Sequence, residues 1–243
     1  MKQPHISIVI PAYNEAHLIA KTLVSLDHYL SEADKPYELI VVDDGSRDDT
    51  VDVVKKFKDI VPNLSLIEHE RNMGKGAAVR TGMLAAVGKY KLFLDADHST
   101  SIDHLDQALP LLREYDVVIG SRAVEGAVLE VPQNWRKRTV GAFGNLLVRI
   151  LLVPGIKDTQ CGFKVFKGEV AQALFSNQRV DGWAFDMEIL AISRQLRHKV
   201  REVPVRWVNG PKSRVRPWSY IEVFIDALRI RWWLWRNSHN LFK

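Results

Sequence analysis

The sequence is poor in cysteine, with one residue, Cys161, among 243. A single thiol excludes a disulfide within the chain and a zinc site built from cysteines, because each needs more than one cysteine. This usage is compatible with a reducing compartment. The fold therefore depends on its core and not on a disulfide or a cysteine-bound zinc, and the hydrophobic fraction of 47 % is enough to build that core.

The sequence also lacks a long apolar run. A membrane-spanning helix needs about 18 or more apolar residues in succession. The nearest candidate, residues 146–153, contains Arg149 and stops at Pro154. Residues 1–5 lead directly into a strand-like stretch without the architecture of a signal peptide. We therefore expect no transmembrane helix and a cytoplasmic location.

Two common nucleotide-binding glycine motifs are missing. The glycine-rich turn at residues 72–76 does not have the Walker spacing, which argues against an ATPase. No G-x-G-x-x-G follows the first predicted strand, which argues against a dinucleotide-dependent oxidoreductase.

The charge balance is mildly basic, with a formal net charge of +5 and a pI near 9.3. Such an excess suits nucleic acid, an anionic membrane or a phosphate-rich substrate. We find no nucleic-acid recognition motif, and the basic residues cluster beside apolar ones, so we expect no nucleic-acid partner.

Apolar strand-like runs alternate with helical patterns through residues 1–122. The expected strands are residues 6–10, 39–42, 64–67, 92–94 and 117–119. The first expected helix starts at Asn14, and the second starts at a capping box formed by Ser46 and Asp49. Two further helices are expected at residues 77–87 and 102–113. Continuous apolar strands separated by helices predict an α/β fold, with a mostly parallel central sheet covered by helices on both faces.

The second half is less regular. We expect helices at residues 135–153, 184–196 and 219–236, a strand at 200–207 and a polar loop at 158–164.

The most informative stretch is residues 92–97, an apolar run that ends in Asp95 and Asp97. Alternate side chains of a strand point to the same side, so both carboxylates would project from its carboxyl end, where open α/β sheets bind ligands. Carboxylates this close repel each other unless a cation lies between them. Mg²⁺ or Mn²⁺ fits, because both prefer oxygen ligands and share them with substrate phosphates. The alternative is an acidic loop that caps the next helix through Thr100 and Asp103.

Polar residues follow the predicted strands of this half. The main stretches are 11–15, 43–44, 71–76, 95–97 and 120–122. The carboxyl ends of parallel strands share one edge of the sheet, so these residues would gather there, together with a helix N-terminus after Gly76 that suits an anion. The combination indicates a site for a nucleotide diphosphate.

In this order and spacing, the stretches resemble the family-2 glycosyltransferases of the GT-A fold, in particular dolichyl-phosphate β-glucosyltransferases and dolichyl-phosphate mannose synthases. Residues 158–164 and 183–188 are more similar to the glucosyl branch. The resemblance implies a GT-A nucleotide-diphospho-sugar transferase fold. Residues 1–215 would form the catalytic domain, with a nucleotide-binding half (1–122) and an acceptor half (123–215), and residues 216–243 would form an amphipathic helix. Eukaryotic glucosyl enzymes begin with a membrane-spanning helix, which suggests that this chain is a prokaryotic or peripheral relative.

The resemblance also implies roles for individual residues. Those that would bind the nucleotide sugar are Pro11, Tyr13, Glu15, Asp43, Lys75, Asp95, Arg206 and Arg214. Those that would contact the sugar or the acceptor are Arg136, Arg138, Asp158, Trp183, Asp186 and Glu188. Asp95 and Asp97 would hold Mg²⁺ or Mn²⁺, and Asp97 and Arg122 would be catalytic. Plain structural roles stay open, such as a core position for Trp183, a solvated Lys75 and an ordinary surface loop at residues 210–214.

The activity that the resemblance implies is metal-dependent, inverting transfer of glucose from UDP-glucose to a polyprenyl (dolichyl-type) phosphate. The acceptor phosphate is anionic at neutral pH, since its second pKa lies near ~6, so we expect no dedicated general base. The alternatives are GDP-mannose as the donor, a glycan as the acceptor, a nucleotidyltransferase that releases pyrophosphate, and a non-catalytic nucleotide-binding protein.

The last predicted helix carries an apolar stripe mixed with arginine. Its members are Ile221, Phe224, Ile225, Leu228, Trp232 and Trp235, with Arg229, Arg231 and Arg236 among or beside them. Tryptophan and arginine together suit the headgroup region of a bilayer. We therefore expect peripheral association with the inner face of the membrane. A core-facing helix or a homodimer interface would give the same pattern.

Overall fold

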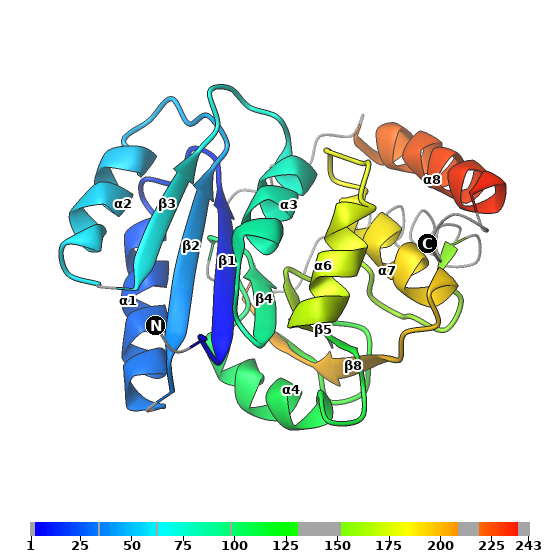
Figure 1. The fold of residues 1–243 in the computed structure, drawn as a ribbon, viewed down its shortest axis with the longest axis horizontal. Helices are drawn as coiled ribbons and strands as arrows, with labels where there is room; N and C mark the ends of the chain where they lie inside the picture. Colours follow the sequence, from blue (N-terminus) through cyan, green and yellow to red (C-terminus); the bar gives the residue numbers. More distant parts are fainter. Residues whose placement is uncertain are drawn as a thin grey trace.

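The computed structural model describes residues 3–33, 35–61, 63–97, 99–130, 152–208 and 219–237. Its centre is a seven-stranded sheet in the order β3-β2-β1-β4-β7-β5-β8 (Figure 1). The strands are β1 (Ile6–Ala12), β2 (Tyr37–Asp43), β3 (Leu64–Glu68), β4 (Tyr90–Leu94), β5 (Val117–Ser121), β7 (Phe163–Lys167) and β8 (Val200–Pro204). Strand β7 is antiparallel to β4 and β5, and the other described pairings of this sheet are parallel. The predicted α/β class with a mostly parallel sheet is therefore confirmed.

Helices cover both faces of the sheet. One layer contains α1 (Ile19–Glu32), α2 (Thr50–Lys58) and α4 (Leu105–Leu111), and the other contains α3 (Lys75–Ala85), α6 (Gly168–Ser176) and α7 (Phe185–Gln195). Alternation along β1 shows why two cores form: Ile8 and Ile10 lie in the core under α1, whereas Val9 lies in the core under α3.

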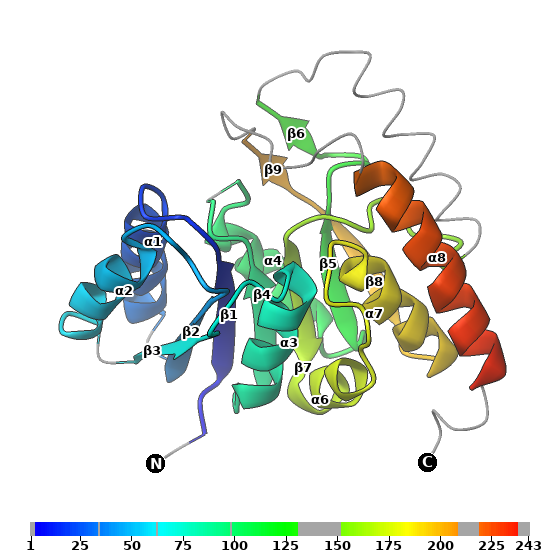
Figure 2. The same cartoon turned by 90° about the horizontal axis from the view of Figure 1, so that it is seen from above.

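Helix α8 (Ser219–Arg236) packs on α7 at the outside of the second layer (Figures 1 and 2). Its bounds match the predicted helix. Ala227, Ile230 and Trp233 are among its residues that join the core. Among the described helices, none combines the length and apolarity needed to cross a membrane.

A short parallel ribbon of β6 (Val128–Leu129) and β9 (Arg206–Trp207) stands apart from the main sheet (Figure 2). The predicted strand at 200–207 is therefore two strands, β8 and β9, separated at Val205. A short 3-10 helix, η1 (Ile102–His104), precedes α4, so the predicted helix at 102–113 is two shorter elements.

Strand β7 and helix α6 were not predicted. The loop predicted at residues 158–164 is too long, because its last two residues, Phe163 and Lys164, belong to β7. Phe163 and Val165 face one core and Phe166 faces the other, so β7 does alternate. Lys164 interrupts the apolar run and obscured the strand. The predicted helix at 135–153 lies almost wholly outside the described residues.

The predicted capping box at Ser46 and Asp49 is also wrong. The Ser46 hydroxyl accepts a hydrogen bond from the Asn14 N–H at 2.8 Å, and Asp48 accepts the Thr50 N–H at 3.1 Å. Ser46 thus joins the loops after β1 and β2 instead of capping α2.

Candidate active site

The site starts where β4 ends beside the start of β7. The Asp95 N–H donates to the Gly162 carbonyl at 3.1 Å, which sets the Asp95 side chain against Gly162. A Cβ atom on residue 162 would lie 1.9 Å from Asp95 Oδ2, so only glycine fits there. Asp97 is exposed, and its Oδ1 accepts the Ser99 N–H at 3.0 Å. The two carboxylates therefore have different surroundings, one enclosed and one open.

Lys75, the first residue of α3, bonds to Asp95. Its Nζ lies 2.6 Å from Asp95 Oδ1, 5.3 Å from the centre of the Phe93 ring and 5.2 Å from that of Trp183. Burial alone would lower the pKa of Lys75, but the negative charges of Asp95, Asp186 and Asp97 outweigh it and raise the pKa above its usual value. Lys75 is therefore a cation bonded to Asp95 at the carboxyl edge of the sheet, and not a freely solvated lysine.

A second lysine–aspartate pair lies deeper. Lys164 of β7 pairs with Asp186 of α7, and both side chains are almost fully buried. Lys164 also donates to the Cys161 carbonyl at 2.6 Å. Burial raises the pKa of Asp186, and the charges of Lys164 and Lys75 only partly offset it. The carboxylate predicted to contact the sugar is thus already bound by a lysine that sequence reasoning missed.

Asp43 is the last residue of β2, and its two carboxylate oxygens differ in their contacts. Its Oδ2 accepts the Ser46 N–H at 2.9 Å, whereas its Oδ1 is buried and has no hydrogen-bond partner among the described residues. The Glu15 N–H donates to the Thr50 hydroxyl at 2.8 Å, which holds the loop after β1 beside this carboxylate. Pro11 lies at the end of β1 and Tyr13 in the loop that follows, and both are partly exposed. These four predicted donor-binding residues are thus brought to one edge.

Arg122 and Asp158, predicted in separate roles, bind each other. The guanidinium of Arg122 makes two bonds to the carboxylate, Nε to Oδ2 at 2.7 Å and Nη2 to Oδ1 at 2.9 Å, and lies 5.4 Å from the Trp207 ring centre. Burial would raise the pKa of Asp158, but its bonds and charge interaction with Arg122 outweigh burial and lower the pKa. The pair is ionised and holds the loop that leads into β7.

The remaining predicted residues are dispersed. Arg206 lies on the β6–β9 ribbon, is 68 % exposed and pairs with Glu130. Trp183 is 40 % exposed and lies outside the core. Glu188 is buried and accepts two backbone N–H groups. Arg136, Arg138 and Arg214 lie outside the described residues.

The glycine turn before α3 packs closely against another loop of the protein. A Cβ on Gly74 would lie 2.4 Å from the Asp181 carbonyl oxygen, and the Ala77 N–H already donates to that oxygen at 3.2 Å. One N–H group of the helix N-terminus after Gly76 is therefore already bound by another loop of the protein, and the binding of an anion there stays a prediction.

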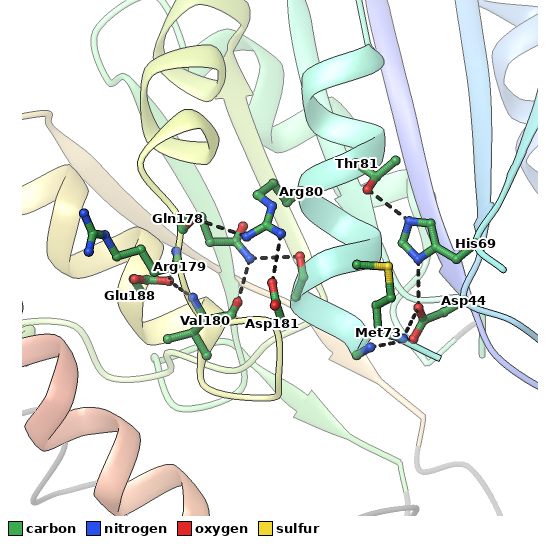
Figure 3. Close-up of polar contacts among 12 residues, drawn as sticks. Asp44, His69, Met73, Arg80, Thr81, Gln178, Arg179, Val180, Asp181 and Glu188 are labelled. Carbon is green, nitrogen blue, oxygen red and sulfur yellow. Dashed lines mark hydrogen bonds and ion pairs between the residues drawn. The ribbon is translucent and has the colours of Figure 1, made fainter. Parts of the chain in front are cut away.

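Asp44 fixes the other side of this turn (Figure 3). Its carboxylate accepts the Met73 and Gly74 N–H groups, each at 2.9 Å, and lies 2.9 Å from His69 Nδ1. The sequence pattern assigned Asp44 no binding role, and the one available signal was its place beside Asp43 at a strand end.

The comparisons with known sequences agree with each other. The family model "Glycosyl transferase family 2" matches residues 7–175. A dolichyl-phosphate β-glucosyltransferase of Trichomonas vaginalis is 36 % identical over 239 residues, which cover 94 % of this chain and 73 % of that protein. The dolichyl-phosphate β-glucosyltransferase of Homo sapiens is 35 % identical over 246 residues, covering 93 % of this chain and 74 % of that protein.

Solved structures support the fold. Glucosyl-3-phosphoglycerate synthase from Mycobacterium tuberculosis, in complex with Mn²⁺, UDP-glucose and phosphoglyceric acid, has a TM-score of 0.67 at 21 % identity, covering 94 % of this chain and 80 % of that chain. At this identity the likeness shows the shared GT-A fold and nothing about the substrate.

Proposed function

Because this chain belongs to glycosyl transferase family 2, we propose that it transfers glucose from UDP-glucose to a polyprenyl phosphate of the dolichyl type. The family and the named relatives make the protein a glycosyltransferase. The observation that carries the finer proposal is that relatives named dolichyl-phosphate β-glucosyltransferase match nearly the whole chain.

The donor nucleoside would lie at the carboxyl ends of β1 and β2. The buried Oδ1 of Asp43, which has no partner among the described residues, would accept a hydrogen bond from the uracil or ribose. A buried acceptor without a donor costs free energy, so a bound ligand that supplies one gains affinity. Pro11 at the end of β1, with Tyr13 and Glu15 in the loop that follows, would frame the same nucleoside.

The acidic residues after β4 fit a divalent cation. The described residues contain no group of three or more histidine, cysteine or acidic side chains that would hold a metal alone. Mg²⁺ and Mn²⁺ are commonly held by one or two carboxylates together with substrate phosphates. Asp97, which is exposed, would be the main ligand, and Asp95 would contribute from beside Lys75. When bound, the cation would stabilise negative charge on the diphosphate.

In the proposed reaction an acceptor phosphate oxygen forms a bond to the anomeric carbon of glucose. The bond from that carbon to the diphosphate oxygen breaks, and UDP leaves with the electron pair. Attack opposite to the leaving group inverts the anomeric centre. Both reactants are anions, so the cations Lys75 and Arg122, each paired with a carboxylate, would reduce their repulsion.

The proposal is tested by measuring which nucleotide diphosphate is released. Purified protein with Mn²⁺ is given UDP-glucose, GDP-mannose or UDP-N-acetylglucosamine, with and without a short polyprenyl phosphate. We expect UDP release from UDP-glucose that depends on the lipid. GDP release from GDP-mannose would replace the proposed donor, and lipid-independent transfer to a glycan would replace the proposed acceptor. Pyrophosphate release from a nucleoside triphosphate would make the protein a nucleotidyltransferase.

Asp43→Asn is expected to raise the KM for the donor by about 10- to 100-fold. The substitution can keep an oxygen for the Ser46 N–H but turns an amide NH₂ toward the nucleoside, and a hydrogen bond to a charged group contributes about 1.5–3 kcal/mol. Initial rates at varied UDP-glucose would measure the change. Asp49→Asn, an exposed residue on the same loop, serves as the matched control. An unchanged donor KM would remove Asp43 from the donor site.

Helix α8 has two apolar sides, and this supports membrane contact. One side is buried on α7 and the core, whereas the other is exposed. The exposed members are Phe224 (40 %), Ile225 (42 %), Leu228 (47 %), Trp232 (57 %) and Trp235 (76 %). At about 100° per residue, they fall on one face with Arg231 on one flank and Arg236 on the other. We propose that this face binds an anionic bilayer surface, which places the active site near a lipid acceptor.

The double variant Arg231→Gln/Arg236→Gln is expected to weaken binding to phosphatidylglycerol vesicles by roughly 25-fold, since each basic residue near an anionic surface contributes about 1 kcal/mol. Vesicle co-sedimentation at fixed ionic strength measures it. Lys56→Gln/Lys58→Gln on α2 makes the same charge change on exposed residues elsewhere. Equal binding by both double variants would contradict the proposal. A wild-type dimer that Trp235→Ser converts to monomer would identify the face as a protein interface instead.

A further inference from the structure

The segment between α6 and α7, residues 178–183, lies directly on the first turn of α3 (Figure 3). The Ala77 N–H donates to the Asp181 carbonyl at 3.2 Å. A Cβ on Gly76 would lie 2.5 Å from the Val180 carbonyl oxygen and 2.7 Å from the Phe185 Cβ. The two backbones are therefore in direct contact, and glycine is needed where they meet.

Glu188 holds this segment from α7. Its Oε2 accepts the Arg179 N–H at 3.0 Å and the Val180 N–H at 2.8 Å, and the residue is 1 % exposed. Burial raises the pKa of Glu188, and the two backbone N–H groups act against this shift. Burial of this carboxylate costs free energy, and both of its hydrogen bonds go to the same segment. Glu188 therefore fixes the backbone of that segment.

Gln178 and Arg80 connect the segment to α3. Gln178 Nε2 donates to the Gly76 and Val180 carbonyls, each at 2.8 Å. Arg80 donates to the Gln178 carbonyl at 3.3 Å and pairs with Asp181 at 2.9 Å. Figure 3 shows these side chains on one side of the α3 N-terminus, with the Asp44 and His69 contacts on the other.

The segment ends at Trp183, which contacts the candidate active site. The Trp183 ring centre lies 5.2 Å from Lys75 Nζ, and the same ammonium lies 2.6 Å from Asp95 Oδ1. Lys75 is itself the first residue of α3, between the two glycines that the segment covers. The backbone that carries Lys75 and the ring that faces its side chain are therefore fixed by the same contacts.

We propose that Glu188, Gln178 and Arg80 are positioning residues of the transferase. They hold residues 178–183 on the α3 N-terminus and so place the Lys75 ammonium against Asp95 for the diphosphate side of the reaction. This rests on the proposed function in one respect, that Asp95 and Lys75 serve the donor. Glu188 then acts on the site through the backbone and does not contact the sugar.

The test compares Glu188→Ala, Glu188→Gln and Arg80→Ala with Glu169→Ala, an exposed glutamate in the first turn of α6. Two measurements are made at a temperature where every variant is folded: hydrogen exchange of the peptide over residues 73–79, and kcat and KM for UDP-glucose transfer. Glu188→Ala is expected to speed exchange in that peptide and to lower kcat/KM by about 100-fold, because displacement of a reacting group by about 1 Å can have that effect. Glu188→Gln keeps an acceptor oxygen and should restore both.

Arg80→Ala keeps the proposal testable if Glu188→Ala fails to fold, because the Arg80 side chain is 28 % exposed and its loss leaves no buried charge. Faster exchange at residues 73–79 with kcat and KM unchanged would overturn the positioning role and leave the proposed function standing. Exchange that changes only within residues 178–190 would also overturn it. Should the wild type instead use another nucleotide sugar, the donor proposal fails, and the same variants measured with that sugar still decide the positioning role.

Discussion

Asp97→Asn is expected to lower kcat by about three orders of magnitude with almost no change in the melting temperature. A divalent cation contributes several kcal/mol of charge stabilisation in the transition state, and about 1.4 kcal/mol corresponds to a factor of ten in rate. Asp97 is exposed, and among the described residues its Oδ1 accepts the Ser99 backbone N–H, a bond that the asparagine oxygen can keep. The substitution therefore removes a charge needed by the metal and little that the fold needs.

Steady-state turnover with titrated Mn²⁺ measures the effect, and excess EDTA should reproduce it in the wild type. Asp52→Asn, an exposed aspartate in the first turn of α2, is the matched control. Full wild-type turnover in EDTA would contradict the metal role. The variant could instead bind Mn²⁺ as tightly as the wild type and stay slow when Mn²⁺ is raised. That result would mean that Asp97 acts on the sugar and not on the metal.

The elements that were predicted well are those whose residue pattern depends only on residues nearby in the sequence. The helix predicted at residues 219–236 is α8 (Ser219–Arg236), and the apolar strands before Asp43 and Asp95 lie where they were expected. Strand β7 was missed because Lys164 looks like a surface residue in sequence. Its partner, Asp186, lies 22 positions away on α7, and nothing local indicates that the two charges are buried together.

In the candidate site, too, the sequence predicted what depends on strand ends and missed what depends on distant segments. Strand-end reasoning placed Asp43, Asp95 and Asp97 at one edge, because parallel strands leave their carboxyl ends together. It could not assign the glycine turn, since the residue that binds Gly76, Gln178, is 102 positions further along the chain. The glycines look like phosphate-binding glycines but accommodate a loop of the protein.

Lys164→Met is expected to lower the free energy of unfolding by about 3–5 kcal/mol, since it leaves one buried charge without its partner. Lys164 and Asp186 are 1 % and 5 % exposed, so water does not screen the carboxylate that remains. The Cys161 carbonyl also loses its donor. This is a large share of the roughly 5–15 kcal/mol typical of a folded domain. Urea unfolding, analysed with both the midpoint and the slope, measures it.

Lys167→Met is the matched control, because it is the same substitution three residues further along β7. The Lys167–Asp116 pair has side chains 28 % and 23 % exposed. Partly exposed pairs contribute about 1 kcal/mol or less, so this variant should lose far less stability. Equal losses in the two variants would show that burial of the Lys164–Asp186 pair does not set the cost.

The double variant Lys164→Met/Asp186→Leu separates stability from catalysis. Replacing both members of a buried ion pair with apolar residues is often neutral or stabilising, so most of the lost stability should return. Turnover should not return, because the negative charge of Asp186 also acts on Lys75, the ammonium that bonds to Asp95. A pair kept for stability alone would give a double variant that is both stable and active. A stable but inactive double variant would mean that the buried charges are retained for the electrostatics of the site.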